Sequence, residues 1–459
     1  MSNFAINMKN FSKNNYYRDL IKLGIPIIIG QLGTIVLGFA DTLMIGHHGT
    51  EDLAAAGLVN NVFNLVLLFY LGFSYGLIPL VGNLYGRGKH QEIGQKVKNS
   101  LLANFLIGLL LMLVMTIVYF NLENMGQPKE LLSLIRPYFI VNVISLPFIG
   151  LFNGLKQFFD GITHAKVSMW VMIIANLLNI LFNGLLIYGY AGFPELGLLG
   201  AGIATLGSRV FMGIVLLCIL LGYRKFAIYK QGLMQGIINR KDMKDLNALG
   251  WPIALQLGME TAAFALSCIM VGWIGTTALA AHQVMVTIGQ LFCLILSGVA
   301  TAASIRISVF YGQNNYSAVI ENAKDCFRLE LIIAMIIAIP VIIFRNQIGG
   351  CFTNNTEVQH MVSIVIFTLI AYQFGDGLQY TYANALRGIA CVRPMVLYAF
   401  IAYFVISLPL GYLLGIHLKF DLVGIWTAFP ISLSVAGIQY YLRFKKEMNL
   451  KMARVIGKD

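Results

Sequence analysis

The sequence predicts an all-α integral membrane protein with twelve transmembrane helices. Of its 459 residues, 58% are apolar and only 11% are charged, whereas ordinary soluble domains carry about 25% charged residues. A helix needs roughly 20 apolar residues to cross a hydrocarbon layer about 30 Å thick. The long uncharged stretches of this chain provide for twelve such crossings, and the composition excludes a soluble globular protein.

The predicted spans follow one another as apolar runs separated by charged residues and by Gly, Pro and Asn. An even number of spans places both termini on the same side of the membrane. In chain order, the predicted helices are 20–46, 53–80, 95–120, 131–156, 167–190, 197–222, 246–273, 278–310, 322–344, 359–386, 394–416 and 422–443.

Lys and Arg are distributed unequally over the two sides of these spans. Arg209 lies inside a span, and four basic residues lie on the side away from the termini, namely Lys129, Arg136, Arg345 and Lys419. All the others among the 32 Lys and Arg lie on the side of the termini. Because cytoplasmic loops carry the excess of Lys and Arg, both termini are predicted to be cytoplasmic. The net charge of +12 then reflects membrane topology, and no nucleic-acid partner is expected.

The chain resembles itself at an offset of 226 residues, which indicates an internal duplication. Two halves of six helices share one orientation, since six is even, and are related by an axis along the membrane normal. We therefore predict two lobes, 1–222 and 246–459, joined by a basic cytoplasmic linker at 223–245. Two similar lobes can rock against each other, which favours a carrier over a scaffold. Matched pairs include Pro26 with Pro252, Gly46 with Gly272 and Tyr85 with Tyr311.

Three carboxylates stand out inside the predicted spans: Asp41, Glu260 and Asp376. A charge near the bilayer centre costs about 2.5–3.5 kcal/mol even on the lenient insertion scale, so each of them requires an explanation. None meets an acid at the corresponding position of the other half. Glu260 and Asp376 are predicted at similar depth, with Tyr372 one helical turn before Asp376.

Two interpretations of these acids remain open from the residues alone. Burial and mutual repulsion favour a carboxyl that binds a proton or Na⁺, and Tyr372 can add its hydroxyl to such a site. Alternatively, each acid is tied to a base or a backbone donor and only joins helices. Arg209, centred in its span, is the one available basic partner, and one arginine cannot neutralise three separated acids. This favours the cation or proton site.

Asn176, Asn179 and Asn183 recur on one face of the fifth predicted helix. Such amides either join membrane helices by hydrogen bonds or line a substrate cavity, and their spacing does not distinguish the two roles. The six cysteines are scattered singly, so we expect no disulfide, no zinc site and no covalent cofactor.

Two segments resemble the multidrug and toxin extrusion (MATE) family, in particular its NorM-type bacterial branch. They are ADTLMIGHHGTEDLAAAGL at 40–58 and LAAHQVMVTIGQ at 279–290, together with SIR at 304–306. The resemblance covers essentially the whole chain. It implies a V-shaped, two-lobed carrier in the bacterial inner (plasma) membrane, functioning as a monomer among membrane lipids. It also implies export of cationic amphiphilic drugs and dyes in exchange for inward Na⁺ or H⁺.

The resemblance assigns roles to the buried acids. Asp41 matches the first-helix acid of the family, Glu260 the helix-seven acid of the NorM branch, and Asp376 its helix-ten acid. In that branch the second-lobe pair is associated with the cation site, so Glu260 and Asp376 are the expected Na⁺ ligands. Tyr372 lies beside them, and Asp41 is expected as a second titrating or substrate-linked group.

The polar residues of the predicted cavity follow from the same resemblance. Asn179 matches the family's helix-five asparagine, and Asn176, Asn183 and Gln283 complete the expected substrate cavity. Asn183 stands where the related DinF branch has an aspartate used in proton coupling. This departure favours Na⁺ coupling at the second-lobe acids without excluding H⁺.

The leading prediction is a secondary active multidrug antiporter that works by alternating access. A flippase for a lipid-linked oligosaccharide is the alternative within the superfamily, but its cavity should carry basic residues for a pyrophosphate, and only Arg209 is a candidate. An intramembrane enzyme is the alternative from another class. It would need a nucleophile or a metal set at helical spacing, and the sequence holds no HExxH motif and no paired Ser and His. We therefore expect no enzymatic activity.

Overall fold

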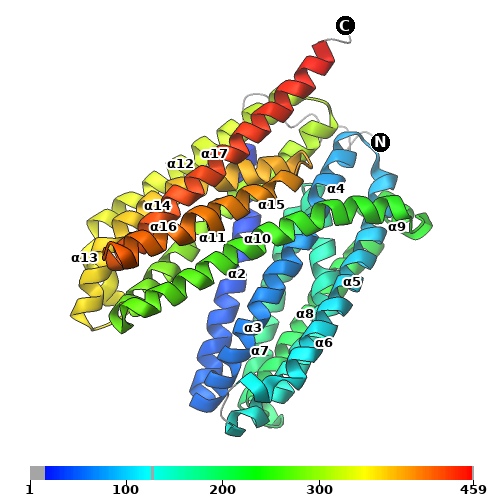
Figure 1. Cartoon of the computed structure of the whole chain (residues 1–459). Helices are drawn as coiled ribbons and strands as arrows, with labels where there is room; N and C mark the ends of the chain where they lie inside the picture. The colour runs from blue at the N-terminus through cyan, green and yellow to red at the C-terminus, as the bar shows by residue number, and fades with distance from the viewer. Residues whose placement is uncertain (1–15, 126–128, 457–459) are drawn as a thin grey trace. The chain divides into compact units, whose positions relative to one another are not determined.

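The computed structural model describes residues 16–125 and 129–456, and every element within them is helical (Figure 1). Twelve segments are long and apolar enough to cross a membrane, which confirms the predicted fold class and number of spans. The candidate spans are 17–48, 50–86, 90–120, 130–161, 165–187, 198–222, 240–274, 276–312, 316–343, 356–388, 393–417 and 421–454.

Some spans contain more than one helical element. The second consists of α3 and α4, and the eleventh includes two π-helical segments, η5 and η6. The elements before the middle of the chain are α2 (Tyr16–His48), α3 (Thr50–Ser74), α4 (Leu77–Gly86), α5 (His90–Phe120), η1 (Leu122–Met125), α6 (Lys129–Gly161), α7 (Ala165–Ile187), η2 (Tyr190–Gly192), α8 (Leu198–Gly222), η3 (Arg224–Phe226) and α9 (Ala227–Gln235). They are followed by α10 (Arg240–Ile274), α11 (Thr276–Gly312), α12 (Tyr316–Ile343), α13 (Arg345–Ile348), η4 (Gly349–Cys351), α14 (Thr356–Gly388), α15 (Arg393–Phe400), η5 (Ile401–Ser407), α16 (Leu408–Tyr412), η6 (Leu413–His417) and α17 (Asp421–Ile456).

The helices group into two compact units. Unit 1 contains the described residues up to Ile28 and from Leu255 onward, and unit 2 contains Ile29–Ala254. The boundaries fall inside α2 and α10, shortly after Pro26 and Pro252, which the repeat places at corresponding positions. The segment 223–245, predicted as a linker, lies in unit 2 and contains α9 and the first residues of α10.

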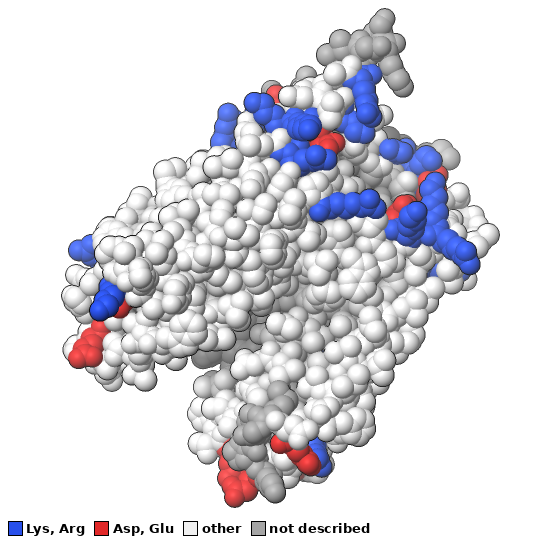
Figure 2. All heavy atoms as spheres, viewed as in Figure 1, with Lys and Arg blue, Asp and Glu red and all other residues white. Residues whose placement is uncertain are grey.

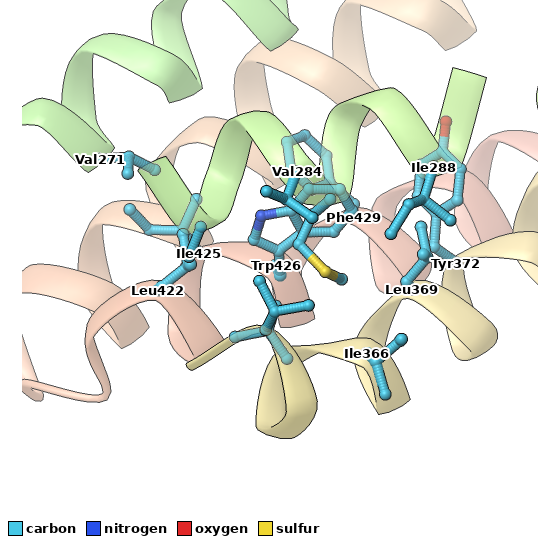
Figure 3. Close-up of a cluster of buried hydrophobic side chains, with 14 of the residues drawn as sticks. Val271, Val284, Ile288, Ile366, Leu369, Tyr372, Leu422, Ile425, Trp426 and Phe429 are labelled. Atoms are coloured by element: carbon cyan, nitrogen blue, oxygen red, sulfur yellow. The ribbon is translucent and has the colours of Figure 1, made fainter. Parts of the chain in front are cut away.

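The core of unit 1 lies between α11, α14 and α17. Trp426 is 1% exposed at its centre, and the Phe429 ring packs edge-on against it at 5.5 Å (Figure 3). Lipid tails are as apolar as these side chains, so such a core is held by close packing more than by exclusion of water. Tyr372 lies at the edge of this cluster, 6.2 Å from the Trp426 ring, and its hydroxyl points away from the apolar group (Figure 3).

Unit 2 is built around α6, which packs against α3, α5 and α8. Tyr70 of α3 is fully buried and donates a hydrogen bond to the Asn104 carbonyl of α5 over 2.5 Å. This contact requires glycine at position 150 on α6, because a Cβ there would lie 1.7 Å from the Tyr70 hydroxyl. A single missing side chain thus lets three helices approach closely.

Charged side chains are confined to the ends of the helices on the face that Figure 2 shows. In each unit, Lys and Arg gather at one end and a long uncharged surface follows, as a membrane-embedded protein requires. At the basic end of unit 2, Lys96 of α5 forms ion pairs with Asp242 (2.5 Å) and Asp245 (2.9 Å) of α10.

Candidate functional site

The polar site of unit 2 joins α2 to α7 through Asp41. The Asn183 amide donates to Asp41 Oδ1 over 2.6 Å. The Asn179 amide, with its nitrogen turned toward Asp41, donates to the same oxygen over 2.9 Å. The lone acid of α2 is therefore held by two asparagines that lie one turn apart on the same face of α7.

The third asparagine of this stripe also reaches across to α2. Asn176 donates to the Gly33 carbonyl over 2.9 Å, so the stripe joins the two helices, as one of the two sequence interpretations expected. Arg209 of α8 does not form an ion pair with Asp41. Its guanidinium donates to Asn142 Oδ1 (3.1 Å) and to the Ser145 hydroxyl (2.5 Å), both on α6.

The polar site of unit 1 contains Glu260 of α10. Glu260 Oε2 accepts hydrogen bonds from the amides of Gln256 (3.2 Å) and Gln379 (3.4 Å). Gln379 also donates to the Tyr403 hydroxyl over 2.7 Å, and Arg387 donates to Gln256 Oε1 over 2.5 Å. Glu260 therefore takes part in a network of neutral amides. The Arg387 guanidinium does not bind the carboxylate directly but is linked to it through Gln256.

Asp376 of α14 is buried, and its Oδ1 has no hydrogen-bond partner within residues 16–125 and 129–456. Gln379, three residues after Asp376 on α14, donates to Glu260 Oε2 over 3.4 Å, so the structure places the two predicted acids on packed helices at adjoining turns. Tyr372 lies one turn away on α14 and packs on Phe264 and Trp426. No hydrogen bond joins Tyr372 to Asp376 among the described contacts.

The predicted acids are not salt-linked to fixed bases. Among the residues that the structure describes, none of Asp41, Glu260 and Asp376 lies within ion-pair distance of a Lys, Arg or His side chain. No group of three or more His, Cys, Asp or Glu side chains there is arranged to hold a metal ion. Any cation near these acids would therefore also need neutral oxygens as ligands.

The expectation that Arg209 is the one available base within the bundle is wrong, because two other arginines are buried there. Arg306 of α11 is 1% exposed and pairs with Asp19 at 3.5 Å, and Arg387 of α14 is 7% exposed beside Gln256. Both occupy the basic end of unit 1. Arg387 directly follows the predicted span 359–386, and α14 continues to Gly388. Arg306 lies within the predicted span 278–310, although it was counted on the side of the termini.

Sequence reasoning also missed Glu330 of α12, a fully buried acid within a span. It is 0% exposed, accepts a hydrogen bond of 2.6 Å from the Thr381 hydroxyl, and lies 3.6 Å from the Cys326 sulfur. Its Oε2 lies 3.5 Å from a Cβ built at Gly377, the residue after Asp376. The signal for it in the sequence is an acid within the predicted span 322–344.

Gln283 lies away from these networks. It is exposed on α11, with its amide 3.7 Å from the Cys268 sulfur. A cavity of about 700 Å³ opens near the starts of α11, α14 and α17, where Thr277, His360 and Asp421 are among its lining residues. None of the predicted site residues lines this cavity.

Comparisons with known proteins agree with the arrangement of the chain in two similar halves. The model of the MatE family matches residues 26–185 and 252–413, one segment in each half. The multidrug resistance protein NorM of Photobacterium profundum is 28% identical, covering 95% of this chain and 96% of its own length. NorM of Vibrio cholerae is 29% identical over 92% and 93% of the two chains.

Solved structures show the same fold. A MATE crystal structure in a bent conformation superposes with a TM-score of 0.88 at 19% identity, covering 96% of this chain and 97% of that one. The eukaryotic MATE transporter AtDTX14 superposes with a TM-score of 0.83 at 18% identity, covering 96% and 99%. At this identity the likeness concerns the fold alone.

Proposed function

Because this chain belongs to the MatE family, a family of multi-pass membrane transporters and not of enzymes, we propose that it is a secondary active multidrug efflux antiporter. It exports cationic amphiphilic drugs and dyes in exchange for Na⁺ or H⁺, by alternating access between its two units. It lies in the bacterial inner membrane as a monomer, with both termini in the cytoplasm.

The observation that carries this proposal is the pair Glu260 and Asp376. Both are assigned to membrane-spanning helices, neither has a fixed basic partner among the described residues, and one oxygen of Asp376 has no hydrogen bond there. Buried charges are costly unless they are paired or bind an ion. A Na⁺ ion or a proton between these carboxyls removes that cost, and Tyr372 adds a neutral oxygen one turn away.

The polar cluster of unit 2 has a related part in the proposal. Asp41 acts as a second titrating or substrate-linked acid, and Asn179 and Asn183 hold it in place. Asn176, which joins α7 to α2, and Gln283 contact substrate. The buried acids favour a cationic cargo. A lipid pyrophosphate would require bases, and Arg209 already donates to Asn142 and Ser145.

The test is dye efflux from proteoliposomes that contain the purified protein and ethidium, a cationic dye. A Na⁺ gradient and a pH gradient are imposed in separate experiments, and the rate of efflux is measured for Glu260→Gln and Asp376→Asn. We expect a rate at least ten times lower in both variants with whichever gradient drives the wild type.

Glu357→Gln serves as the matched control, because Glu357 is an exposed acid on α14, the helix that carries Asp376. It should transport at the wild-type rate. Unchanged efflux in both buried-acid variants would end the assignment of the coupling site.

A further inference from the structure

A buried polar seam runs between α12 and α14 in unit 1. Asn322, Cys326 and Glu330 are spaced four residues apart and therefore lie on one face of α12. Gln373, Gly377 and Thr381 have the same spacing on α14. All six residues are buried.

The middle of this seam is closed by direct contacts around Glu330. The Thr381 hydroxyl donates to its Oε2 over 2.6 Å and lies 3.8 Å from the Cys326 sulfur. A Cβ built at Gly377 would lie 3.5 Å from the same oxygen. The Glu330 carboxyl thus lies between the two helices, against the turn of α14 that carries Asp376.

The two ends of the seam carry polar groups that lack protein partners. Both side-chain polar atoms of Asn322 and of Gln373 are buried without a hydrogen bond among the described residues. Leaving a buried polar group unsatisfied is costly, and such groups in native proteins usually bind water or ions. Two amides in this state on facing helices therefore indicate a polar route along the seam.

The seam extends from the neighbourhood of Asp376 toward the basic end of unit 1. Asn322 precedes Glu330 by eight residues, or about 12 Å along α12 at 1.5 Å per residue. It lies toward the end of α12 that carries Lys324 and Arg328, the basic end of unit 1. Asp376 directly precedes Gly377, whose built Cβ would lie 3.5 Å from Glu330 Oε2, and Gln379 of the same helix donates to Glu260 Oε2 over 3.4 Å. The segment 376–379 of α14 therefore adjoins both acids.

We propose that Glu330 is a further cation-binding carboxyl, a relay between Asp376 and the cytoplasmic end of unit 1 for the coupling Na⁺ or proton. This inference rests on the proposed antiport function. It adds Glu330 to the cation-binding residues and assigns the seam between α12 and α14 as the path of the cation. An interhelical tie alone would need no acid, because a neutral amide accepts the Thr381 hydrogen bond equally well. A carboxyl without a base among the described residues adds affinity for a positive ion.

The first experiment measures whether a cation reaches the seam. In protein whose other five cysteines are replaced by alanine, Cys326 is exposed to Ag⁺, a thiol-reactive monovalent cation close in size to Na⁺. We expect Ag⁺ to react with Cys326 from the cytoplasmic side, more slowly in excess Na⁺ or at low pH, and at least ten times more slowly in Glu330→Gln. An unreactive Cys326, or equal rates in both proteins, would overturn the relay.

The second experiment separates cation release from movement of the dye. Net ethidium efflux driven by Na⁺ or by a pH gradient is compared with dye-for-dye exchange without a gradient. In Glu330→Gln, net efflux should fall at least tenfold with the driving cation while exchange is unchanged, because exchange needs no cation release. Equal loss of both rates, or no loss of either, would contradict the proposal.

Two further variants guard against misfolding and local effects. Thr381→Val removes the hydroxyl that orients Glu330 but conserves the shape of the side chain. It should lower the rate of net efflux, by a smaller factor than Glu330→Gln does. Glu321→Gln alters an exposed acid on the same helix and should leave both rates unchanged. If wild-type protein shows no driven efflux, the antiport function itself fails, whereas the Ag⁺ reaction still reports on the seam.

Discussion

The side-chain amide of Asn183 on α7 donates a hydrogen bond to Asp41 Oδ1 on α2 over 2.6 Å. Removing this amide leaves a buried carboxylate with one donor fewer. We expect Asn183→Ala to lower the free energy of unfolding by about 1–3 kcal/mol. In an Asp41→Leu background the same substitution should cost less than about 0.5 kcal/mol, because the acceptor is gone.

This cycle is measured by reversible denaturation in detergent micelles. Tyr70→Phe is the matched control, because its hydrogen bond to Asn104 involves neither residue and its cost should be the same in both backgrounds. If the two costs of Asn183→Ala are equal, the contact does not contribute to stability.

Glycine 150 gives a steric prediction. In an open helix position, alanine is more favourable than glycine by roughly 0.5–1 kcal/mol. At position 150 the added methyl meets the Tyr70 hydroxyl at 1.7 Å, so Gly150→Ala should destabilise the protein by about 1–3 kcal/mol. The melting temperature in micelles checks this, and Tyr70→Phe in the same chain should restore part of the loss.

The control for this steric effect is Gly207→Ala on α8, where no atom lies within 4 Å of a built Cβ. It should leave the melting temperature unchanged or raise it slightly. A similar drop for both substitutions would mean that the loss does not come from the contact with Tyr70.

The ion pair at the basic end of unit 2 gives a third prediction. Lys96 and Asp242 have side chains only 14% and 8% exposed, so Lys96→Met leaves a nearly buried carboxylate without its base. We expect a loss of about 3 kcal/mol. The exposed pair of Lys89 and Glu92 is the control, since both side chains are at least half exposed and Lys89→Met should cost less than about 1 kcal/mol.

Denaturant unfolding in micelles measures both losses. Equal effects of the two lysine substitutions would show that burial does not determine the strength of the Lys96 contact.

A pH dependence follows from His164, in the connection between α6 and α7. Burial lowers the pKa of His164 below its usual range, and nearby Lys225 lowers it further. The unfolded chain therefore binds a proton at a higher pH than the native one, so His164 reduces stability as the pH falls below about 6.5. His164→Gln should make the melting temperature less sensitive to acid between pH 7.5 and 5.

His360→Gln is the comparison for this measurement, since His360 is exposed on α14. Its melting temperature should follow the wild-type pH curve. An unchanged acid sensitivity in His164→Gln would rule out His164 as the source.

The number of spans and the membrane class could be predicted because a lipid environment leaves few choices. Every backbone polar group must be satisfied within the chain, so long apolar runs form helices. Periodicity likewise indicated an amide face on one helix that either joins helices or lines a cavity, but the contact of this face with Asp41 came from the structure and was not predicted.

The burial of Glu330 could not be predicted in the same way. Glu330 follows Arg328 closely in the sequence, a pattern typical of the water-facing end of a span, yet the structure buries it against Thr381. Arg306 and Arg387 were likewise counted on the cytoplasmic side, because both lie at the ends of their predicted spans. Whether a charged residue near the end of a span turns inward depends on which helix packs there, and a single sequence does not contain this information.

The pattern of apolar runs also did not predict where helices break or end within the spans. The second span was expected as one helix over 53–80, but α3 ends at Ser74 and α4 begins at Leu77. The last span continues to Ile456, well past the predicted residue 443. Apolar runs predict which residues lie in the lipid. Where a helix ends depends on its contacts with neighbouring helices and on turns exposed to water.

The backbone passes between the two compact units at two places. One lies between Ile28 and Ile29, and the other between Ala254 and Leu255. Both connections are continuous helix. A chain severed between α9 and α10 would consequently give two fragments, each supplying the other's bundle with the beginning of a helix, and neither piece alone could complete a folded body.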